Sequence, residues 1–532
     1  MRSVEAVVLL VALATVVAAF AGRLRVPAPS LLVAAGVAVG LLPGAPAIHV
    51  PPAVVSLVVL PPLLYAASEE LSWRDLRAVW RPVAVLAVGL VLASAAAVAA
   101  VAGAVASLSL SMAFVLGAVL ASTDPVAVSA LGRRLSLPAR VQTLVQAESL
   151  FNDGTSLVLF QIAVSFAVAG TAGQAVGGVV LHGAVRFMLL TLGGAAAGGV
   201  LAAGVVLLRR RVTDPVLETV VALVTPYAAY VLGVALHVSP VLAVIVAGLV
   251  IGGRRDLITS ARSRLQLHSV YQTVIFLLES VVFSLIGLQL PTLIRALPGP
   301  EAWLADALAV TGALIVARML WVFPLSAVSQ RHGGARPSWP VPAVVSWAGT
   351  RGVVPLAAAL SIPLTTASGA PLAHRDLILV IAIAAIVISL IVQGLTLGPL
   401  VRVAGIAQSG DADEEDAVAR LRLAEAALAR LEELADEASA AGDHLGERDD
   451  DAIGRARAGL RARIRRARAR AEGTAAAEPG GLTDRDLRRA LNAAEHAELA
   501  RLYDDGTISQ AARQQLQRSL DLEAARLSDD HH

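Results

Sequence analysis

The sequence predicts an all-α protein that crosses a membrane many times and ends in a soluble helical tail. Of its 532 residues, 56% are hydrophobic and only 16% are charged, whereas a soluble domain has nearer a quarter charged residues. The apolar residues also form blocks of roughly 18 to 28 residues, each long enough to cross about 30 Å of hydrocarbon. A membrane β-barrel would show short alternating segments instead. These two observations define a polytopic helical membrane protein.

The membrane part is predicted to span residues 1–403 and to hold about thirteen transmembrane helices. The first block resembles a signal peptide, but Arg23 and Arg25 follow its apolar run instead of preceding it, so we interpret it as a transmembrane helix. The helices are expected at residues 4–21, 29–46, 51–67, 81–104, 109–131, 141–168, 179–208, 215–236, 239–252, 270–290, 303–326, 341–364 and 376–403.

The loop arginines predict the orientation. If the tail is cytoplasmic, the outside segments hold only Arg2, Arg295 and Arg375. The cytoplasmic loops then hold Arg23, Arg25, Arg74, Arg77, Arg81, Arg133, Arg134, Arg140, Arg209, Arg210, Arg211, Arg254, Arg255, Arg262, Arg264, Arg331 and Arg336. The positive-inside rule therefore predicts an odd number of helices in the cell membrane, with the N-terminus outside.

The tail, residues 404–532, is predicted to be a soluble helical domain with a regulatory role. Its first part, "DADEEDAVARLRLAEAALARLEELADEASAAG", has Leu and Ala at helical spacing among charged residues. The run "RARAGLRARIRRARARAE" indicates a solvated helix face, with anionic-lipid binding as the alternative. A further helix is expected to begin at Leu482-Thr483-Asp484. No GxGxxG or Walker motif occurs, so a nucleotide-sensing tail is unsupported.

Polar side chains occur well inside a few apolar blocks, where a charge is costly and normally faces a partner or a water-filled cavity. Since few segments carry them, we expect one shared site. They are Thr123, Asp124, Glu148, Ser149, Asn152, Asp153, Glu279, Arg318, Thr350 and Arg351.

The stretch "AESLFNDGTSLVLF", residues 147–160, has the densest set of polar residues. Glu148 and Asn152 are four residues apart, as are Ser149 and Asp153, so each pair lies on one face of a helix. The two faces adjoin and form one polar stripe that faces inward. Asp153 lies near the middle of its block, and hence near the bilayer midplane.

One further stretch is predicted to interrupt a membrane helix, and another places an arginine inside a membrane segment. In "STDPV", residues 122–126, Pro125 disfavours helix at Asp124. An unwound stretch at the midplane can hold a cation; a simple proline kink with a capping Asp is the alternative, and the nearby Asp153 favours the ion site. In "SWAGTRGVVPLAAAL", a buried Arg351 needs an anion, for which Glu148 is the candidate and Asp124 the alternative.

Two other acidic residues have competing interpretations. Glu279 either joins the cavity or is a paired structural residue. Asp214, within the repeated Thr-Asp-Pro triplet 213–215, follows an Arg cluster and is predicted to be an ordinary helix N-cap.

The chemistry of the set favours an alkali cation. Oxygen ligands without any Cys suit such an ion better than a transition metal. A carboxyl group buried in an apolar environment holds its proton more tightly than in water, so it can hold either a proton or a cation, and this competition is sufficient for antiport. Asn152 supplies an amide where a second acid would add a charge. One-for-one, electroneutral exchange is therefore predicted.

Five stretches together resemble the sodium/proton exchanger branch of the monovalent cation/proton antiporters. They are "ASTDPVAVSAL", "ESLFNDGTSLVLF", "TPYAAYVLGVALHVSPVLAVIVAGLVIG", "SWAGTRGVVPLAAAL" and "QGLTLGPL". The segment "LYDDGTISQAARQQLQRSLDLEAARL", residues 502–527, is also similar to the tail end of bacterial members. The resemblance covers essentially the whole membrane part.

The resemblance implies thirteen helices with inverted repeats and a homodimer. It implies that Asp153 carries the ion or proton, that Thr123, Asp124, Ser149 and Asp153 line the cation site with Asn152 close by, and that Glu148 pairs with Arg351. The transported species would be protons and Na⁺, or Li⁺ or K⁺, with no cofactor and no nucleic-acid partner. Members often carry Asn where Glu279 stands, which puts the stoichiometry and the preferred cation in question.

The alternative function is conduction instead of exchange. A cation channel, or a channel-like sensor gated by the tail, would use the same carboxylates. An intramembrane enzyme is not expected, because the sequence has no HExxH signature and no convincing Ser–His nucleophile constellation.

Overall fold

In the computed structural model, every regular element in the part of the chain that it describes is a helix, and an isolated bridge joins Thr365 and Pro371. It describes residues 12, 14–17, 28–42, 52–71, 73–124, 139–169, 176–212, 214–254, 261–297, 302–332, 338–406, 411–440, 447–471, 495, 501 and 505. The chain forms two compact units, Met1–Ser409 and Gly410–His532, whereas the sequence placed the boundary after residue 403.

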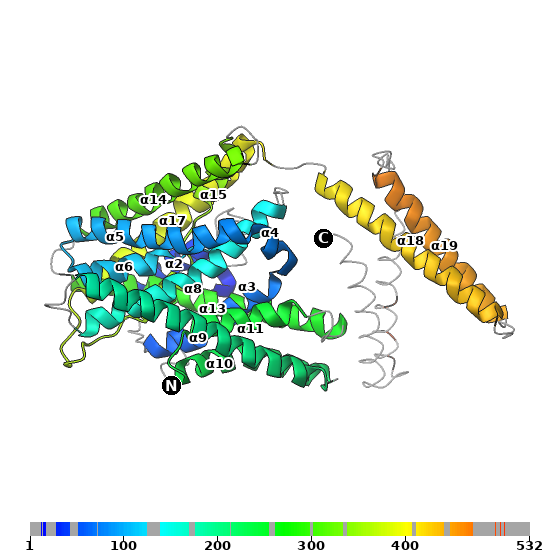
Figure 1. Cartoon of the computed structure of the whole chain (residues 1–532), viewed down its shortest axis with the longest axis horizontal. Coiled ribbons are helices and arrows are strands. Elements are labelled where there is room, and N and C mark those ends of the chain that lie inside the picture. The colour runs from blue at the N-terminus through cyan, green and yellow to red at the C-terminus, as the bar shows by residue number, and fades with distance from the viewer. Residues whose placement is uncertain are drawn as a thin grey trace. The chain divides into compact units, whose positions relative to one another are not determined.

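The first unit is a bundle of apolar helices (Figure 1). Their bounds are α2 (Ala28–Gly40), α3 (Pro52–Glu70), α4 (Trp73–Ala84), η1 (Val85–Leu90), α5 (Val91–Val105), α6 (Leu110–Ala121), α8 (Ala139–Ala169), α9 (Val176–Arg209), α10 (Pro215–Ala235), α11 (Pro240–Gly252), α13 (Ala261–Ala296), α14 (Trp303–His332), α15 (Pro340–Trp347), α16 (Val353–Leu360) and α17 (Arg375–Ala404).

These helices confirm the predicted membrane fold, although not the count of thirteen. Among the described residues, seven helices are long and apolar enough to cross a membrane, and three shorter apolar helices accompany them. The predicted first helix, residues 4–21, lies almost entirely outside the described residues. Every other predicted block coincides with at least one helix.

Two blocks differ from a single straight helix. The block expected at 81–104 belongs to a longer helix that runs from α4 through the π-helical segment η1 into α5. Its first turns carry exposed Trp73 and Trp80, and the guanidinium of Arg81 lies 5.6 Å from the Trp80 ring. Trp and Arg at a helix end are typical of a membrane interface. The block expected at 341–364 is divided into α15 and α16.

Small residues let the central helices pack closely. Gly36 of α2 and Gly287 of α13 lie where these helices cross, because a Cβ at Gly287 would come within 2.9 Å of the Gly36 Cα. On α11, Gly248 packs against Ser68 and Gly252 packs against Glu69 of α3. Close backbone approach of this kind is how membrane helices gain packing energy in a solvent as apolar as themselves.

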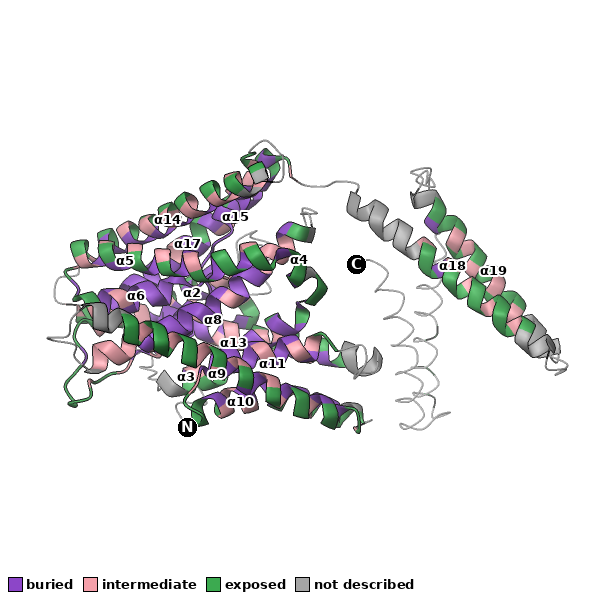
Figure 2. Cartoon of the chain, viewed as in Figure 1, coloured by how far each residue is buried: buried purple, intermediate pink, exposed green. Residues whose placement is uncertain are grey.

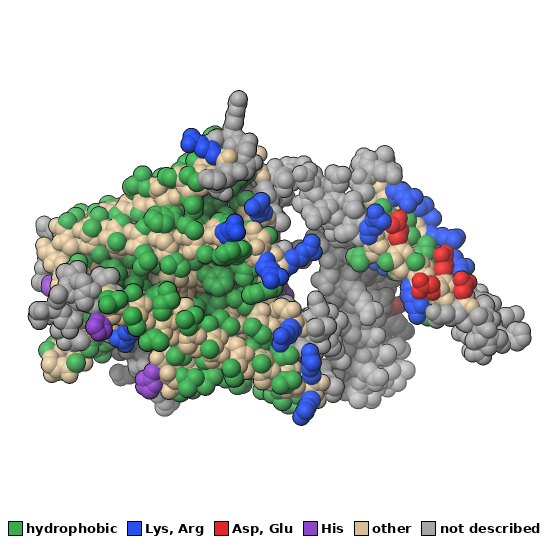
Figure 3. All heavy atoms as spheres, in the orientation of Figure 1, with side chains coloured by type: hydrophobic (Ala, Val, Ile, Leu, Met, Phe, Trp, Pro, Cys, Tyr) green, Lys and Arg blue, Asp and Glu red, His purple; other side chains and the backbone are tan. Residues whose placement is uncertain are grey.

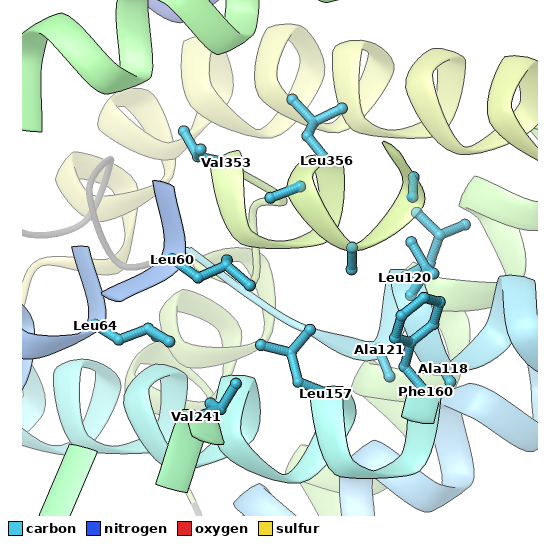
Figure 4. Packing of buried hydrophobic residues seen from close by; sticks show 14 of the residues in the cluster. Leu60, Leu64, Ala118, Leu120, Ala121, Leu157, Phe160, Val241, Val353 and Leu356 are labelled. Atoms are coloured by element: carbon cyan, nitrogen blue, oxygen red, sulfur yellow. The ribbon is translucent and has the colours of Figure 1, made fainter. Parts of the chain in front are cut away.

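The core of the bundle surrounds α6, α8 and α16. Figure 2 shows α6 and α8 mainly buried between helices with exposed outer faces. In Figure 4, Leu60 of α3, Leu120 of α6, Leu157 of α8, Val241 of α11 and Leu356 of α16 pack together. Four other helices therefore hold α8 in place from several sides.

The outer surface separates apolar side chains from arginines. Figure 3 shows a broad hydrophobic face on the first unit, with Arg side chains gathered at one end of it. Gly252 against Glu69 places the C-terminal ends of α3 and α11 at the same end of the bundle, and the exposed Arg74, Arg77 and Arg254 follow them directly. This segregation fits a protein whose flank lies in lipid.

The second unit contains a pair of helices, α18 (Asp411–Ala440) and α19 (Glu447–Ala471). Ala424 of α18 and Ala467 of α19 are buried, and Arg468 lies 3.4 Å from Glu425, so the two helices pack as a hairpin. The helix start expected at 482–484 and the segment 502–527 lie outside the described residues, apart from Asp505.

Candidate functional site

Two non-helical segments, residues 122–124 and 348–352, meet at the centre of the bundle. Helix α6 ends at Ala121, and residues 122–124 are not helical, with Ser122 in an extended conformation. The second interruption, residues 348–352, separates α15 from α16. At the crossing the Asp124 amide donates to the Thr350 carbonyl at 2.7 Å, and the Thr350 hydroxyl donates to the Asp124 carbonyl at 2.9 Å. The predicted break at residues 122–124 is confirmed, while Pro125 and the residues up to 138 lie outside the described residues. The prediction of one helix at 341–364 is wrong, because residues 348–352 separate α15 from α16.

Residues of the second non-helical segment bond to the backbone groups that a helix would have paired with each other in the first. In a continuous helix the Asp124 amide would donate to the Leu120 carbonyl. Here Thr350 accepts from that amide, and the Arg351 Nε donates to the Leu120 carbonyl at 2.9 Å. Both groups of the broken bond are thus satisfied by adjacent residues of one segment. This satisfaction is what makes non-helical backbone tolerable inside a membrane protein.

Helix α8 brings its polar stripe against the first interruption. The Ser122 hydroxyl donates a short hydrogen bond to the Asp153 carboxylate. The hydroxyls of Thr123 and Ser149 are 3.1 Å apart. All four of these side chains are buried. The neighbouring faces expected on this helix therefore both point to the site.

Glu148 pairs with Arg318, and the predicted pair with Arg351 is wrong. Arg318 of α14 binds the Glu148 carboxylate with both terminal nitrogens, at 2.9 Å and 2.7 Å, and all of these groups are buried. The same guanidinium donates to the Val345 carbonyl near the end of α15. A bidentate Arg–carboxylate pair is the strongest form of this interaction.

Arg351 does not pair with Glu148 because its guanidinium is bound elsewhere. The Arg351 guanidinium is occupied by the carbonyls of Leu120 and Gly349. Arg318 reaches Glu148 by passing Gly349, where a Cβ would come within 2.5 Å of its Nε. The sequence predicts that both arginines lie inside the membrane, but no spacing within one helix shows which arginine of another helix lies opposite Glu148.

Asn152 contributes a free acceptor. Its Nδ2 donates to Glu148 Oε1 at 3.2 Å. Its Oδ1 is buried and, among the described residues, accepts no hydrogen bond. A buried carbonyl oxygen without a donor is costly, unless a ligand such as a cation or a water molecule occupies its lone pairs.

The remaining acidic residues take two different places. Glu279 of α13 is half-buried and close enough to Asp124 for their charges to interact, and Asp124 interacts in the same way with Asp153. Glu279 thus lies beside the site. Asp214 is the N-cap of α10, where it accepts from the amides of Val216 and Leu217 at 2.7 Å and 3.1 Å, as predicted. Thr213 lies outside the described residues.

Membrane-length helices around two interrupted segments, with carboxylates where those segments cross, define a secondary transporter. The family model "Sodium/hydrogen exchanger, transmembrane" matches residues 8–403. The chain belongs to this family of exchangers, so the alternative of a cation channel is not supported.

Named relatives agree with this assignment. The chain is 38% identical over 451 residues to an uncharacterised Na⁺/H⁺ exchanger of Mycobacterium tuberculosis, covering 82% of this chain and 81% of the relative. It is 33% identical over 353 residues to the Na⁺/H⁺ antiporter NhaP of Pseudomonas aeruginosa, covering 64% and 79%. Its fold is similar to that of the sodium proton antiporter MjNhaP1 of Methanocaldococcus jannaschii, with a TM-score of 0.62 at 20% identity over 76% of this chain and 98% of that one.

Proposed function

We propose that the protein exchanges protons for monovalent cations by competition at Asp153. The observation that carries the proposal is the difference between the two carboxylates of α8. Arg318 neutralises Glu148, whereas no basic side chain pairs with Asp153 in the part of the chain that the structure describes. A carboxylate without a fixed counter-charge can be neutralised by a proton or by a cation, and binding one excludes the other.

The oxygen atoms around Asp153 suit a small alkali cation. The free Asn152 Oδ1 and the Ser149 hydroxyl lie on the polar stripe of α8, and the Thr123 hydroxyl lies in the adjacent non-helical segment, 3.1 Å from the Ser149 hydroxyl. Hard oxygen ligands favour Na⁺, Li⁺ or K⁺ over transition metals. Because only one exchanging carboxylate is proposed, each cycle moves one cation against one proton and is electroneutral.

The setting of this activity is the cell membrane. The gathering of arginines at one end of the bundle supports a cytoplasmic location for that end and for the tail, with the N-terminus outside. We propose a homodimer on the ground of family membership, and a regulatory role for the α18–α19 hairpin. Such an exchanger would serve cation and pH homeostasis.

The test is a flux assay in vesicles that contain the purified protein and a pH-sensitive dye. Added Na⁺, Li⁺ or K⁺ should drive proton movement, and Asp153→Asn should abolish it. Asp306→Asn is the matched control, because Asp306 is a buried acid of α14 outside the site. Wild-type protein that moves no protons with any of the three cations would refute the proposal, and full activity in Asp153→Asn would refute the role of that residue.

A further inference from the structure

Helix α17 carries two buried polar side chains that the exchange mechanism does not use. Ser389 and Gln393 are four residues apart and both are buried. They therefore lie on one face of the helix. That face meets the interruption between α15 and α16, since both side chains bond to its backbone.

These two side chains stand in place of one missing helical hydrogen bond. In a continuous helix the Arg351 amide would donate to the Trp347 carbonyl. Instead, the Arg351 amide donates to Ser389 Oγ at 3.2 Å, Ser389 Oγ donates to Gln393 Oε1 at 2.5 Å, and Gln393 Nε2 donates to the Trp347 carbonyl at 3.2 Å. We call this series the α17 relay. It joins the donor and the acceptor of the broken bond through two side chains.

The α17 relay acts on the segment that organises the cation site. Its two ends are the Trp347 carbonyl and the Arg351 amide, and Thr350 lies between them. Thr350 and Arg351 in turn satisfy the Asp124 amide and the Leu120 carbonyl at the first interruption. A side chain inserted into the helical ladder is a recognised cause of an interrupted helix. The relay thus supports the second interruption, and the second interruption supports the first.

We infer that Ser389 and Gln393 are positioning residues of the cation site, which they hold in place by keeping the 347–351 bond open. The inference rests on the proposed exchange function, and neither side chain is placed in contact with the cation. Without the relay, the Trp347 carbonyl and the Arg351 amide are buried and unsatisfied, and the arrangement that satisfies both is the direct helical bond between them. Forming that bond draws Thr350 and Arg351 away from Asp124 and Leu120.

The test compares Ser389→Ala and Gln393→Leu, which break the relay, with Ser389→Thr, which keeps the hydroxyl. Thr396→Val is the matched control, because Thr396 lies one turn further along α17 and accepts from the Trp347 indole at 2.7 Å, not from the interrupted backbone. In the vesicle assay both disruptive variants should raise the apparent KM for Na⁺ by about tenfold, the effect of one lost hydrogen bond in a buried network. The maximal rate should stay within about twofold of wild type, because Asp153 is unchanged.

Three further results decide the matter. Ser389→Thr and Thr396→Val should keep the wild-type KM, and the double variant Ser389→Ala/Gln393→Leu should be no worse than either single one, since both act on one relay. The rise in unfolding temperature that Na⁺ gives the detergent-solubilised protein compares cation binding among the variants without transport. If Gln393→Leu does not accumulate, Ser389→Ala alone tests the inference. Unchanged KM in both disruptive variants, or a lower maximal rate at unchanged KM, overturns the inference while active wild-type protein leaves the exchange function intact.

Discussion

At the level of single residues, the proposed exchange depends on the different roles of two carboxylates, Glu148 and Asp153, which lie about 1.4 turns apart on the same helix. Glu148 is held by Arg318 and is unavailable as an exchanging group, whereas Asp153 accepts a hydrogen bond from Ser122 and has no cationic partner among the described residues. A buried ion pair contributes little net stability, but loss of one partner leaves an uncompensated charge. The pair is therefore best tested by removing its members singly and together.

The partner of Glu148 can be identified by a double-mutant cycle. Glu148→Gln should lower stability by about 3–5 kcal/mol because it leaves Arg318 buried and unpaired. Combining it with Arg318→Met should recover a large part of that loss, and combining it with Arg351→Met should recover none. The measurement is thermal unfolding of the solubilised protein. A coupling energy larger for Arg351 than for Arg318 would show that the described pairing is incorrect.

On the proposed mechanism, we expect Asn152 to set the charge moved in each cycle. Asn152→Asp places a second titrating carboxylate beside Asp153, so exchange should become electrogenic and should respond to an imposed membrane potential. The assay is the vesicle flux with the potential clamped or free, and wild-type protein should show no such response. Potential-independent exchange by an active Asn152→Asp variant would mean that the neighbour does not set the stoichiometry.

At the level of helices, α17 stabilises the non-helical segment 348–352, and that segment stabilises residues 122–124. Thr350 and Arg351 form hydrogen bonds with backbone groups of the first interruption. Ser389 and Gln393 form hydrogen bonds with backbone groups of the second. Gly352 allows close approach at this crossing, because a Cβ there would overlap the Asp124 carboxylate. A side chain at position 352 would therefore have to displace the Asp124 carboxylate.

Gly352→Ala should displace Asp124 and reduce exchange by at least about tenfold, since a small misplacement of a site group costs one to two orders of magnitude in rate. Gly204→Ala on α9 is the matched control, because a Cβ there meets nothing within 4 Å. Vesicle flux, normalised to the amount of inserted protein, is the readout. Equal activity of the two variants would show that the crossing tolerates a side chain.

The helices could be predicted from the sequence and the contacts between them could not. Membrane thickness sets the length of each apolar block, so the positions of α8, α9 and α17 follow from composition alone. Helical spacing likewise placed Glu148 and Asn152 on one face, and the structure joins them by a hydrogen bond of 3.2 Å. The choice between Arg318 and Arg351 depends on the path of α14 past Gly349, and the role of Gln393 depends on the register of α17 against Trp347. Neither relation has a signature within a single segment.

At the scale of the whole molecule, the bundle has two chemically different ends. Exposed arginines follow α3, α9 and α11. The loop between α16 and α17 lies at the other end, because its Ala367 amide donates to the Val168 carbonyl near the end of α8, from which α9 runs back. The positive-inside rule then predicts a cytoplasmic location for the arginine end.

Because the chain has no Cys, single cysteines report this orientation directly. Both Arg210 and Ser368 are exposed. In intact cells, Ser368→Cys should react with a membrane-impermeant maleimide and Arg210→Cys should react only after the membrane is opened. The reverse labelling pattern would show that the arginine end faces outward and would contradict the predicted orientation.

The central claim is that a proton and a cation compete for Asp153, and proton release on cation binding measures this without any transport. Addition of Na⁺ to the solubilised protein in weak buffer with a pH dye should release protons from wild type and from Asp306→Asn, and should release none from Asp153→Asn. Proton release that survives in Asp153→Asn, or its absence in wild type that nevertheless binds Na⁺, would contradict the claim.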